Sequence, residues 1–420
     1  MRGAGPDRMT SVTPPRAAVR RLALGRVISV TGTFGAGTAL NFDIWRQTRS
    51  SAWVAATMLV TFAIIGFFGP LAGAVADRFD RRRLMMLGET GAAACWLAMT
   101  VVRSPAGLLA LAFAASLLES PFFPASSAAI PNLAGEADIG WANSLIAMGR
   151  HTGITLGPLL GGLGVAAFGA PAVFAANAAS YLASVLLVSS VRGRFSDPGR
   201  TAEEARTHAG LLAGFRFIGR DRVLRTMAIG WFVFLLGMGM SLVADPALAD
   251  AFGAGSFGYG MLTAAWGAGT ILGSMVARRA TERSEGPWIV GCSFALALTA
   301  FGVATAPVFA VAVAWVAVFG LADGPTLVIE QNLLQRRTPD IVRSRVVGGF
   351  ETIMHGGLSF SLLLGAAIVP RVGPKGAYGV AGAMAVVGAA LLLPLLRWLP
   401  ERRPAAPDAE LEPPFNAVVR

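Results

Sequence analysis

The feature that most constrains this chain is a series of long apolar runs separated by short clusters of arginine. Many runs exceed the roughly 20 residues that an α-helix needs to cross the hydrocarbon core of a bilayer. Only 14% of the 420 residues are charged, whereas a soluble protein carries roughly 25%. Backbone polar groups in lipid must be hydrogen-bonded within the chain, so the pattern predicts a bundle of membrane-spanning helices.

We predict an all-α membrane protein with twelve transmembrane helices in two pseudo-symmetric halves of six. The expected spans are 22–44, 52–76, 84–102, 106–131, 141–168, 171–191, 223–247, 257–277, 287–305, 307–335, 346–370 and 376–398. The corresponding domains are an N-terminal tail (1–21), a first half (22–191), a central loop (192–222), a second half (223–398) and a C-terminal tail (399–420). Within the loop, Leu211, Phe215 and Ile218 recur at helical spacing, which indicates either an amphipathic helix on the membrane surface or part of a solvated linker.

The basic residues predict the orientation. With the N-terminus inside, the cytoplasmic segments hold 29 basic residues and the outer loops five, which leaves only Arg150 within a span. Positive charge favours the cytoplasmic side, so both termini are expected in the cytoplasm and the protein in the inner membrane. Because the net charge of +11 is confined to alternate loops, we expect no nucleic-acid partner.

No cofactor, metal or catalytic site is expected. Cys95 and Cys292 both lie inside apolar runs and are predicted to be small core residues. His151 and His355 have too few additional ligands around them for zinc. Neither a phosphate loop nor a Ser/His/Asp constellation is present, which argues against an ATP-driven pump and against an enzyme.

An internal repeat appears at an offset of 204 residues. Glu119 and Pro121 correspond to Asp323 and Pro325. The other pairs at this offset are His151 with His355, Gly153 with Gly357, Gly161 with Gly365, Gly169 with Gly373, Gly35 with Gly239, and Asn41 with Asp245. Parallel halves related by an axis along the membrane normal are typical of one class of transporters.

A glycine, two acids and a run of arginines lie between the second and third predicted spans. These residues are Gly73, Asp77, Arg78, Asp80, Arg81, Arg82 and Arg83. The stretch resembles the loop motif of the major facilitator superfamily, in which the acid pairs with an arginine and supports the conformational change. A merely topogenic basic loop is the alternative.

The fifth span carries a second motif, made of Gly153, Gly157, Pro158, Gly161 and Gly162. It is similar to the antiporter motif of the exporting members of that superfamily. Its small residues allow close helix packing and its proline removes a backbone donor. Generic packing of a glycine-rich helix is the alternative.

Over about residues 20–400, the chain resembles the branch of the superfamily that contains the enterobactin exporter and bacterial macrolide-efflux proteins. The supporting stretches include 72–83, 131–144, 257–261 and 334–340. The resemblance implies a monomeric secondary active exporter that exchanges protons for an amphipathic drug, macrolide or siderophore. An importer or facilitator on the same fold is the first alternative, and an intramembrane enzyme or receptor the second. The fourth span lacks an arginine, so no basic switch residue is assigned there.

Ionisable residues inside the spans are the candidates for the site, because a charge in the bilayer centre costs at least about 2.5–3.5 kcal/mol. The candidates for proton coupling are Glu119, Asp323, Glu351, His355 and Asp245, and those for the substrate cavity are Asn41, Asp43, Arg150 and His151. The resemblance places Glu119 and Asp323 at the interface between the halves. A structural role is the alternative for these acids and for the Glu351–His355 pair, and a salt bridge with Arg46 is favoured for Asp43. We expect Glu89 to support the loop between the second and third spans.

Overall fold

The computed structural model describes residues 15–61, 75, 78–134, 138–191, 193, 195, 211–338 and 340–399, and these residues form helices without any strand. The first group of helices is α1 (Pro15–Thr48), a short helix Ser51–Thr61, α3 (Arg81–Met99), α4 (Pro105–Glu119), α5 (Phe122–Ala134), α6 (Ile139–Phe168) and α7 (Ala170–Ser190). After α9 (Leu211–Arg220), the second group is α10 (Arg222–Ala251), α11 (Gly255–Val276), α12 (Glu285–Ala304), α13 (Phe309–Arg337), α14 (Asp340–Leu392) and α15 (Leu395–Trp398).

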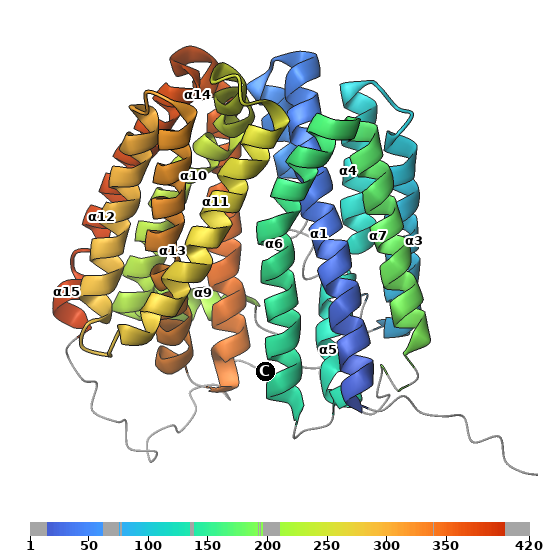
Figure 1. Cartoon of the computed structure of the whole chain (residues 1–420). Helices are drawn as coiled ribbons and strands as arrows, with labels where there is room; N and C mark the ends of the chain where they lie inside the picture. Colours follow the sequence, from blue (N-terminus) through green and yellow to red (C-terminus); the bar gives the residue numbers. More distant parts are fainter. Residues whose placement is uncertain are drawn as a thin grey trace, which may run out of the picture.

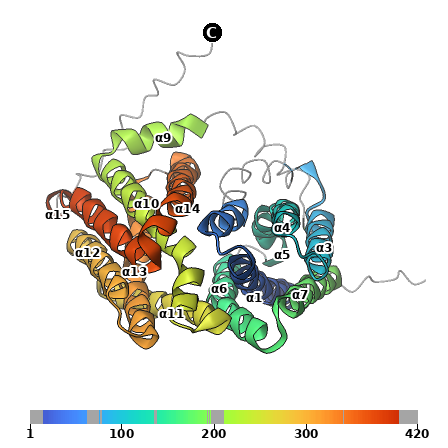
Figure 2. The same cartoon turned by 90° about the horizontal axis from the view of Figure 1, so that it is seen from above.

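The two groups of helices lie side by side (Figures 1 and 2). In the first group α1 packs against α6 and α7, and in the second α10 packs against α14 while α11 packs against α13. The main contact between the groups is made by α6 and α11. We call the end of the bundle at which α1 begins the lower end, as drawn in Figure 1, and the opposite end the upper end.

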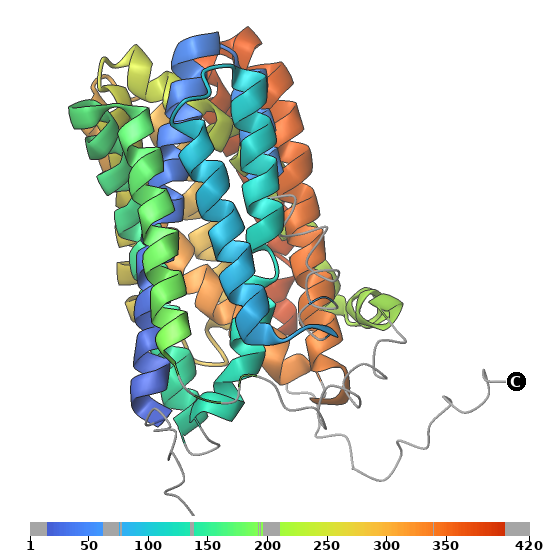
Figure 3. The ribbon, with the colours of Figure 1, turned by 90° about the vertical axis from the view of Figure 1, so that its right-hand side faces the viewer.

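The central segment forms the helix that its spacing indicated. Helix α9 lies across the lower end of the bundle, roughly perpendicular to the long helices (Figures 2 and 3). It contacts α10 and α14, and its Ile218 side chain is buried while Phe215 is exposed. The helix therefore presents one apolar edge to the second group of helices.

The surface and the composition are those of a multi-pass membrane protein. In the described part of the chain, seven helices are long and apolar enough to cross a membrane. Large apolar side chains are exposed on several of them, among them Leu160, Phe168, Leu186, Leu298 and Leu363. Such an apolar exterior is favourable in lipid and unfavourable in water. The count of twelve spans remains a prediction, because residues 62–74 of the second predicted span lie outside the described residues.

A proline interrupts the helix of the fourth predicted span, 106–131. Helix α4 ends at Glu119 and α5 begins at Phe122, with Pro121 between them, inside one candidate membrane span, Pro105–Ser127. A proline lacks the backbone donor that would continue the helix. The eleventh and twelfth predicted spans, 346–370 and 376–398, lie on either side of a kink in α14 at Gly373, whose backbone angles are not helical.

The turn at Gly373 has a counterpart in the first group of helices. Gly169, which joins α6 to α7, has φ 83° and ψ 165°, and Gly373 has φ 74° and ψ 172°. Residues with a side chain rarely adopt this conformation. The two positions are mates at the offset of 204, so the sequence repeat corresponds to the same backbone turn in each group.

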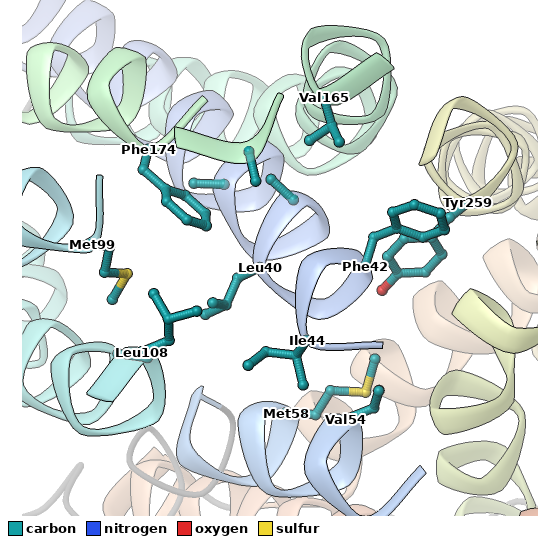
Figure 4. Close-up of a cluster of buried hydrophobic side chains, with 14 of the residues drawn as sticks. Leu40, Phe42, Ile44, Val54, Met58, Met99, Leu108, Val165, Phe174 and Tyr259 are labelled. Carbon is teal, nitrogen blue, oxygen red and sulfur yellow. The ribbon is translucent and has the colours of Figure 1, made fainter. Parts of the chain in front are cut away.

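Buried apolar side chains fill the upper part of the first group. Leu40, Ile44, Met99, Leu108 and Phe174 belong to one cluster that joins α1, α3, α4 and α7 (Figure 4). A second cluster fills the other group between α10, α12, α13 and α14. Polar residues within the bundle are therefore surrounded by apolar packing, and each of them needs a specific partner.

Candidate functional site

The glycines of α6 let two helices approach its backbone on different sides. A methyl carbon built on Gly161 would lie 2.1 Å from the carbonyl oxygen of Gly35 in α1. One built on Gly157 would lie 2.7 Å from the carbonyl oxygen of Thr31. On another side, a carbon on Gly162 would lie 2.4 Å from the carbonyl oxygen of Ser256 in α11. Only glycine fits at these positions, so the motif holds α6 between α1 and α11.

The remaining motif positions continue the same contacts. A methyl carbon on Gly153 would lie 2.8 Å from Val30 in α1, and the carbonyl oxygen of Pro158 lies against Gly260 in α11. The second group repeats the arrangement between α10 and α14, where a carbon on Gly239 would lie 2.7 Å from Ser361. The glycines of the repeat thus set equivalent helix pairs in both groups.

At the upper end, side chains of α1 join the two groups of helices. Arg49 forms an ion pair with Asp250 at the end of α10. Asn41 Nδ2 donates a hydrogen bond of 3.4 Å to the hydroxyl of Tyr259 in α11. The rings of Phe42 and Tyr259 stack with their centroids 6.5 Å apart (Figure 4). The two groups are therefore tied together at this end.

Asp245 of α10 belongs to the same upper cluster. Its carboxylate is buried and accepts a hydrogen bond from the hydroxyl of Tyr378 in α14. It also interacts electrostatically with Tyr259. Asn41 and Asp245, which are mates in the sequence repeat, therefore both interact with Tyr259.

Asp43 has a different partner from the predicted one. Gln47 Nε2 donates to its carboxylate at 2.7 Å, and no ion pair with Arg46 forms among the described residues. Residues 43 and 47 are one helical turn apart on α1, which brings their side chains together.

Glu119, at the end of α4, lies in a polar cluster of the first group. The Tyr181 hydroxyl donates to its carboxylate at 2.5 Å, and the Thr33 hydroxyl lies 2.8 Å from the Tyr181 hydroxyl. Arg26 Nη1 of α1 lies 3.7 Å from the other carboxylate oxygen. The 29 basic residues assigned to the cytoplasmic segments from the sequence include Arg26, and this assignment is wrong for Arg26, because it lies within α1 and its side chain is 13% exposed.

Asp323, the sequence mate of Glu119, has partners in the second group. Trp266 Nε1 of α11 donates to its carboxylate at 3.2 Å. The partners found for Glu119 and Asp323 thus belong to separate groups, and no contact joins the two acids in the described structure. Pro325 also differs from Pro121, because α13 continues through it.

The remaining charged candidates lie nearer the lower end. His355 Nδ1 lies 2.9 Å from the carbonyl oxygen of Glu351 and 3.6 Å from its carboxylate, as their spacing on α14 predicted. Glu330 of α13 interacts electrostatically with Glu351. Arg150 and His151 are exposed on α6, and Arg150 interacts with Glu351 across the two groups.

The loop motif connects the start of α3 to the segment after α7. Asp80 caps α3 by accepting a hydrogen bond of 2.8 Å from the backbone of Arg83. Arg81 is buried and donates to the carbonyl oxygen of Phe195 at 3.4 Å. Arg82 donates to the carbonyl oxygen of Ser189. Arg78 is exposed, whereas Gly73 and Asp77 lie outside the described residues.

Tyrosines are the functional residues that sequence reasoning missed. The chain contains three, and each contacts a polar candidate: Tyr181 with Glu119, Tyr259 with Asn41 and Tyr378 with Asp245. A buried tyrosine hydroxyl usually finds a partner. Three tyrosines, all within apolar runs, were a signal that could have been used. Among the described residues, no group of three His, Cys, Asp or Glu side chains could hold a metal ion.

Known proteins resemble the chain over most of its length. A family model described as "Transmembrane secretion effector" matches residues 10–417. The uncharacterized MFS-type transporter YfiS of Bacillus subtilis is 28% identical over 364 residues, which cover 81% of this chain and 84% of YfiS. The enterobactin exporter EntS of Escherichia coli O1:K1 / APEC is 26% identical over 396 residues, which cover 90% of this chain and 92% of EntS.

Solved structures share the fold. A bacterial homolog of the human lysosomal transporter Spinster aligns with a TM-score of 0.72 and 18% identity, covering 94% of this chain and all of that one. The nucleoside transporter NupG aligns with a TM-score of 0.69 and 16% identity, covering 91% of this chain and 99% of NupG.

Proposed function

The chain belongs to the transmembrane secretion effector family of the major facilitator superfamily, and from this premise we propose that it is a secondary active exporter of an amphipathic small molecule. The match to the enterobactin exporter supports outward transport. It also favours a siderophore over the drug and macrolide classes. Members of the superfamily are transporters and not enzymes, so the polar residues of the bundle serve binding and conformational change.

The observation that carries the proposal is the set of contacts between the two groups at the upper end. Arg49 with Asp250 and Asn41 with Tyr259 are side-chain contacts that can break without unfolding a helix. Alternating access requires such a breakable closure on one side of a central site. The arginine distribution supports a cytoplasmic N-terminus. With that orientation the upper end faces outward, and the contacts there close the protein to the outside.

Proton antiport is supported by carboxyl groups within the membrane. Glu119 and Asp323 remain the leading candidates, and Asp245 is a third because it lies beside the upper closure. The alternative is the Glu351–His355 pair near the lower end. An inner-membrane location and a monomeric state complete the proposal.

The test uses inside-out vesicles with enterobactin as the probe. When the vesicle interior is made acidic, the wild-type protein should accumulate enterobactin inside the vesicles. Glu119→Gln and Asp323→Asn should each abolish acceleration by the gradient and leave exchange without a gradient measurable. Glu282→Gln is the matched control, because Glu282 is an exposed carboxylate paired with Arg336 outside the apolar core.

The outcomes separate the alternatives. Accumulation driven by an alkaline interior would identify an importer. If the pH gradient does not change enterobactin flux through the wild-type protein, the protein is a facilitator. If the gradient acts equally on both single variants and the wild type, the two acids do not couple protons and the Glu351–His355 pair becomes the candidate.

A further inference from the structure

Glu89 is an acid of α3 to which the proposed mechanism assigns no role. Its side chain is 1% exposed, and the Ser184 hydroxyl donates to Oε1 at 2.8 Å. The second oxygen, Oε2, has no hydrogen-bond partner in the described structure, and neither does the hydroxyl of Ser29. Ser29 lies beside the same carboxyl group. We expect from the sequence that Glu89 supports the loop between the second and third spans. The side chains around its carboxyl group come instead from α1 and α7.

Close packing of two helices brings Glu89 toward Glu119. A methyl carbon built on Gly88 would lie 2.5 Å from the carbonyl oxygen of Leu118. Because Gly88 has no side chain, α3 can contact the backbone of α4 at Leu118. Gly88 and Leu118 directly precede Glu89 and Glu119, so the two acids lie next to this contact. The two carboxyl groups consequently interact with one another and with Arg26.

This cluster holds two carboxyl groups but one cation. The facing ionisable groups are Arg26 of α1, Glu119 of α4 and Tyr181 of α7. Helix α5 and residues 62–76 contain no ionisable residue, and Arg150 of α6 acts on Arg26 by repulsion. Arg26 pairs with Glu119 and lies 5.1 Å from the ring centroid of Phe122.

A buried carboxylate without a cation is costly. The effective penalty is several kcal/mol per ion after relaxation, and such a group takes up a proton instead. A protonated Glu89 can donate its O–H to the Ser29 hydroxyl, so the neutral form is compatible with the hydrogen bonding around it. The charge count favours this neutral species.

We propose that Glu89 stores a proton that it exchanges with Glu119 when Arg26 changes partner. While Arg26 pairs with Glu119, Glu89 is neutral. When Arg26 moves to Glu89, the O–H bond of Glu89 breaks and an O–H bond forms on Glu119, so the cluster stays neutral overall. Glu119, whose side chain is 23% exposed while that of Glu89 is sealed, then releases this proton and takes up another before Arg26 returns to it, so that the stored proton is restored in each cycle.

Helix α1 connects this exchange to the upper closure. It carries Arg26 in the cluster and Asn41 near the upper end, and Arg49 directly follows its last residue, Thr48. A displacement of α1 that opens the upper end therefore also moves Arg26 relative to the two acids. This coupling rests on the proposed exporter function, whereas the protonation of Glu89 does not.

Infrared spectroscopy of the purified protein in lipid nanodiscs tests the protonation directly. At neutral pH the wild type should show a C=O band of a protonated carboxyl group that Glu89→Gln removes. Glu119→Gln should also remove it, because Arg26 then has only Glu89 as its partner. Arg26→Gln should add a second such band, because neither acid then has a cation. Ser184→Ala should shift the Glu89 band without removing it. Thermal unfolding confirms that each variant is folded. If Glu89→Gln is not, Glu89→Asp replaces it, and the expected result is then a shifted band instead of a lost one.

A band unchanged between the wild type and Glu89→Gln would overturn the proposal. Enterobactin flux in vesicles then tests the coupling. Glu89→Gln should reduce acceleration by the pH gradient to 1-fold, whereas Glu89→Asp should keep part of it. If the wild type moves no enterobactin, the exporter assignment fails and the infrared result still decides the state of Glu89. Full acceleration in folded Glu89→Gln would rule out the role in coupling.

Discussion

At the scale of single residues, the clearest pH-dependent contact lies outside the membrane. Arg16 near the start of α1 donates two hydrogen bonds of 3.1 Å to Asp138, which precedes α6. The hydrogen bond and charge of Arg16 lower the pKa of Asp138 from its ordinary value. Because the pKa of Asp138 is lower in the folded protein than in the unfolded chain, its ionised carboxylate stabilises the fold above the unfolded-state pKa. This stabilisation is lost as the pH falls through the folded-state pKa. We expect Asp138→Asn to lower the melting temperature slightly at neutral pH and to match the wild type in acid.

The effect should be small, because the Arg16 side chain is 67% exposed and surface ion pairs contribute little. Arg16→Gln should give the same loss, and the double variant should lose no more than either single one. Added salt should shrink the difference. A difference that persisted unchanged into acid would mean that Asp138 acts through something other than its charge.

At the scale of helices, the glycine face of α6 gives a prediction about packing. Gly161→Ala places its new carbon 2.1 Å from the backbone of Gly35, so α1 and α6 must separate. Overpacking of this kind costs about 1–3 kcal/mol, and it should lower the melting temperature measured in detergent. The matched control is Gly37→Ala on α1, because a carbon built there meets nothing within 4 Å. Equal melting temperatures for the two variants would contradict the close α1–α6 contact.

At the scale of the whole molecule, the Arg49–Asp250 pair is expected to hold the two groups of helices together at the upper end. Arg49→Asp leaves two negative charges in contact, so the upper end should open more often. In a background where Cys95 and Cys292 are serine, Asn41→Cys should then react several-fold faster with a membrane-impermeant maleimide added outside intact cells. Combining Arg49→Asp with Asp250→Arg should restore the slow rate. Unchanged labelling in the single variant would show that other contacts keep this end closed.

The sequence by itself determined the membrane-spanning character and the repeat. Long apolar runs admit few other structures in lipid, and Gly169 and Gly373 adopt the same turn because the conformation is nearly restricted to glycine. The α6 motif also predicted close packing, since a missing side chain allows backbone contact whatever the partner is. These inferences depend on properties of the residue or of its own helix.

Only the tertiary structure decided which side chains meet. The partners of Glu119, Asp245 and Asp323 depend on how each helix is rotated about its axis and on which neighbour faces it. Sequence position could not show that Arg26 turns inward toward an acid, because a loop count registers only distance along the chain. Glu89 gained its significance in the same way, since one cation shared by two buried carboxyl groups exists only once three helices have packed together.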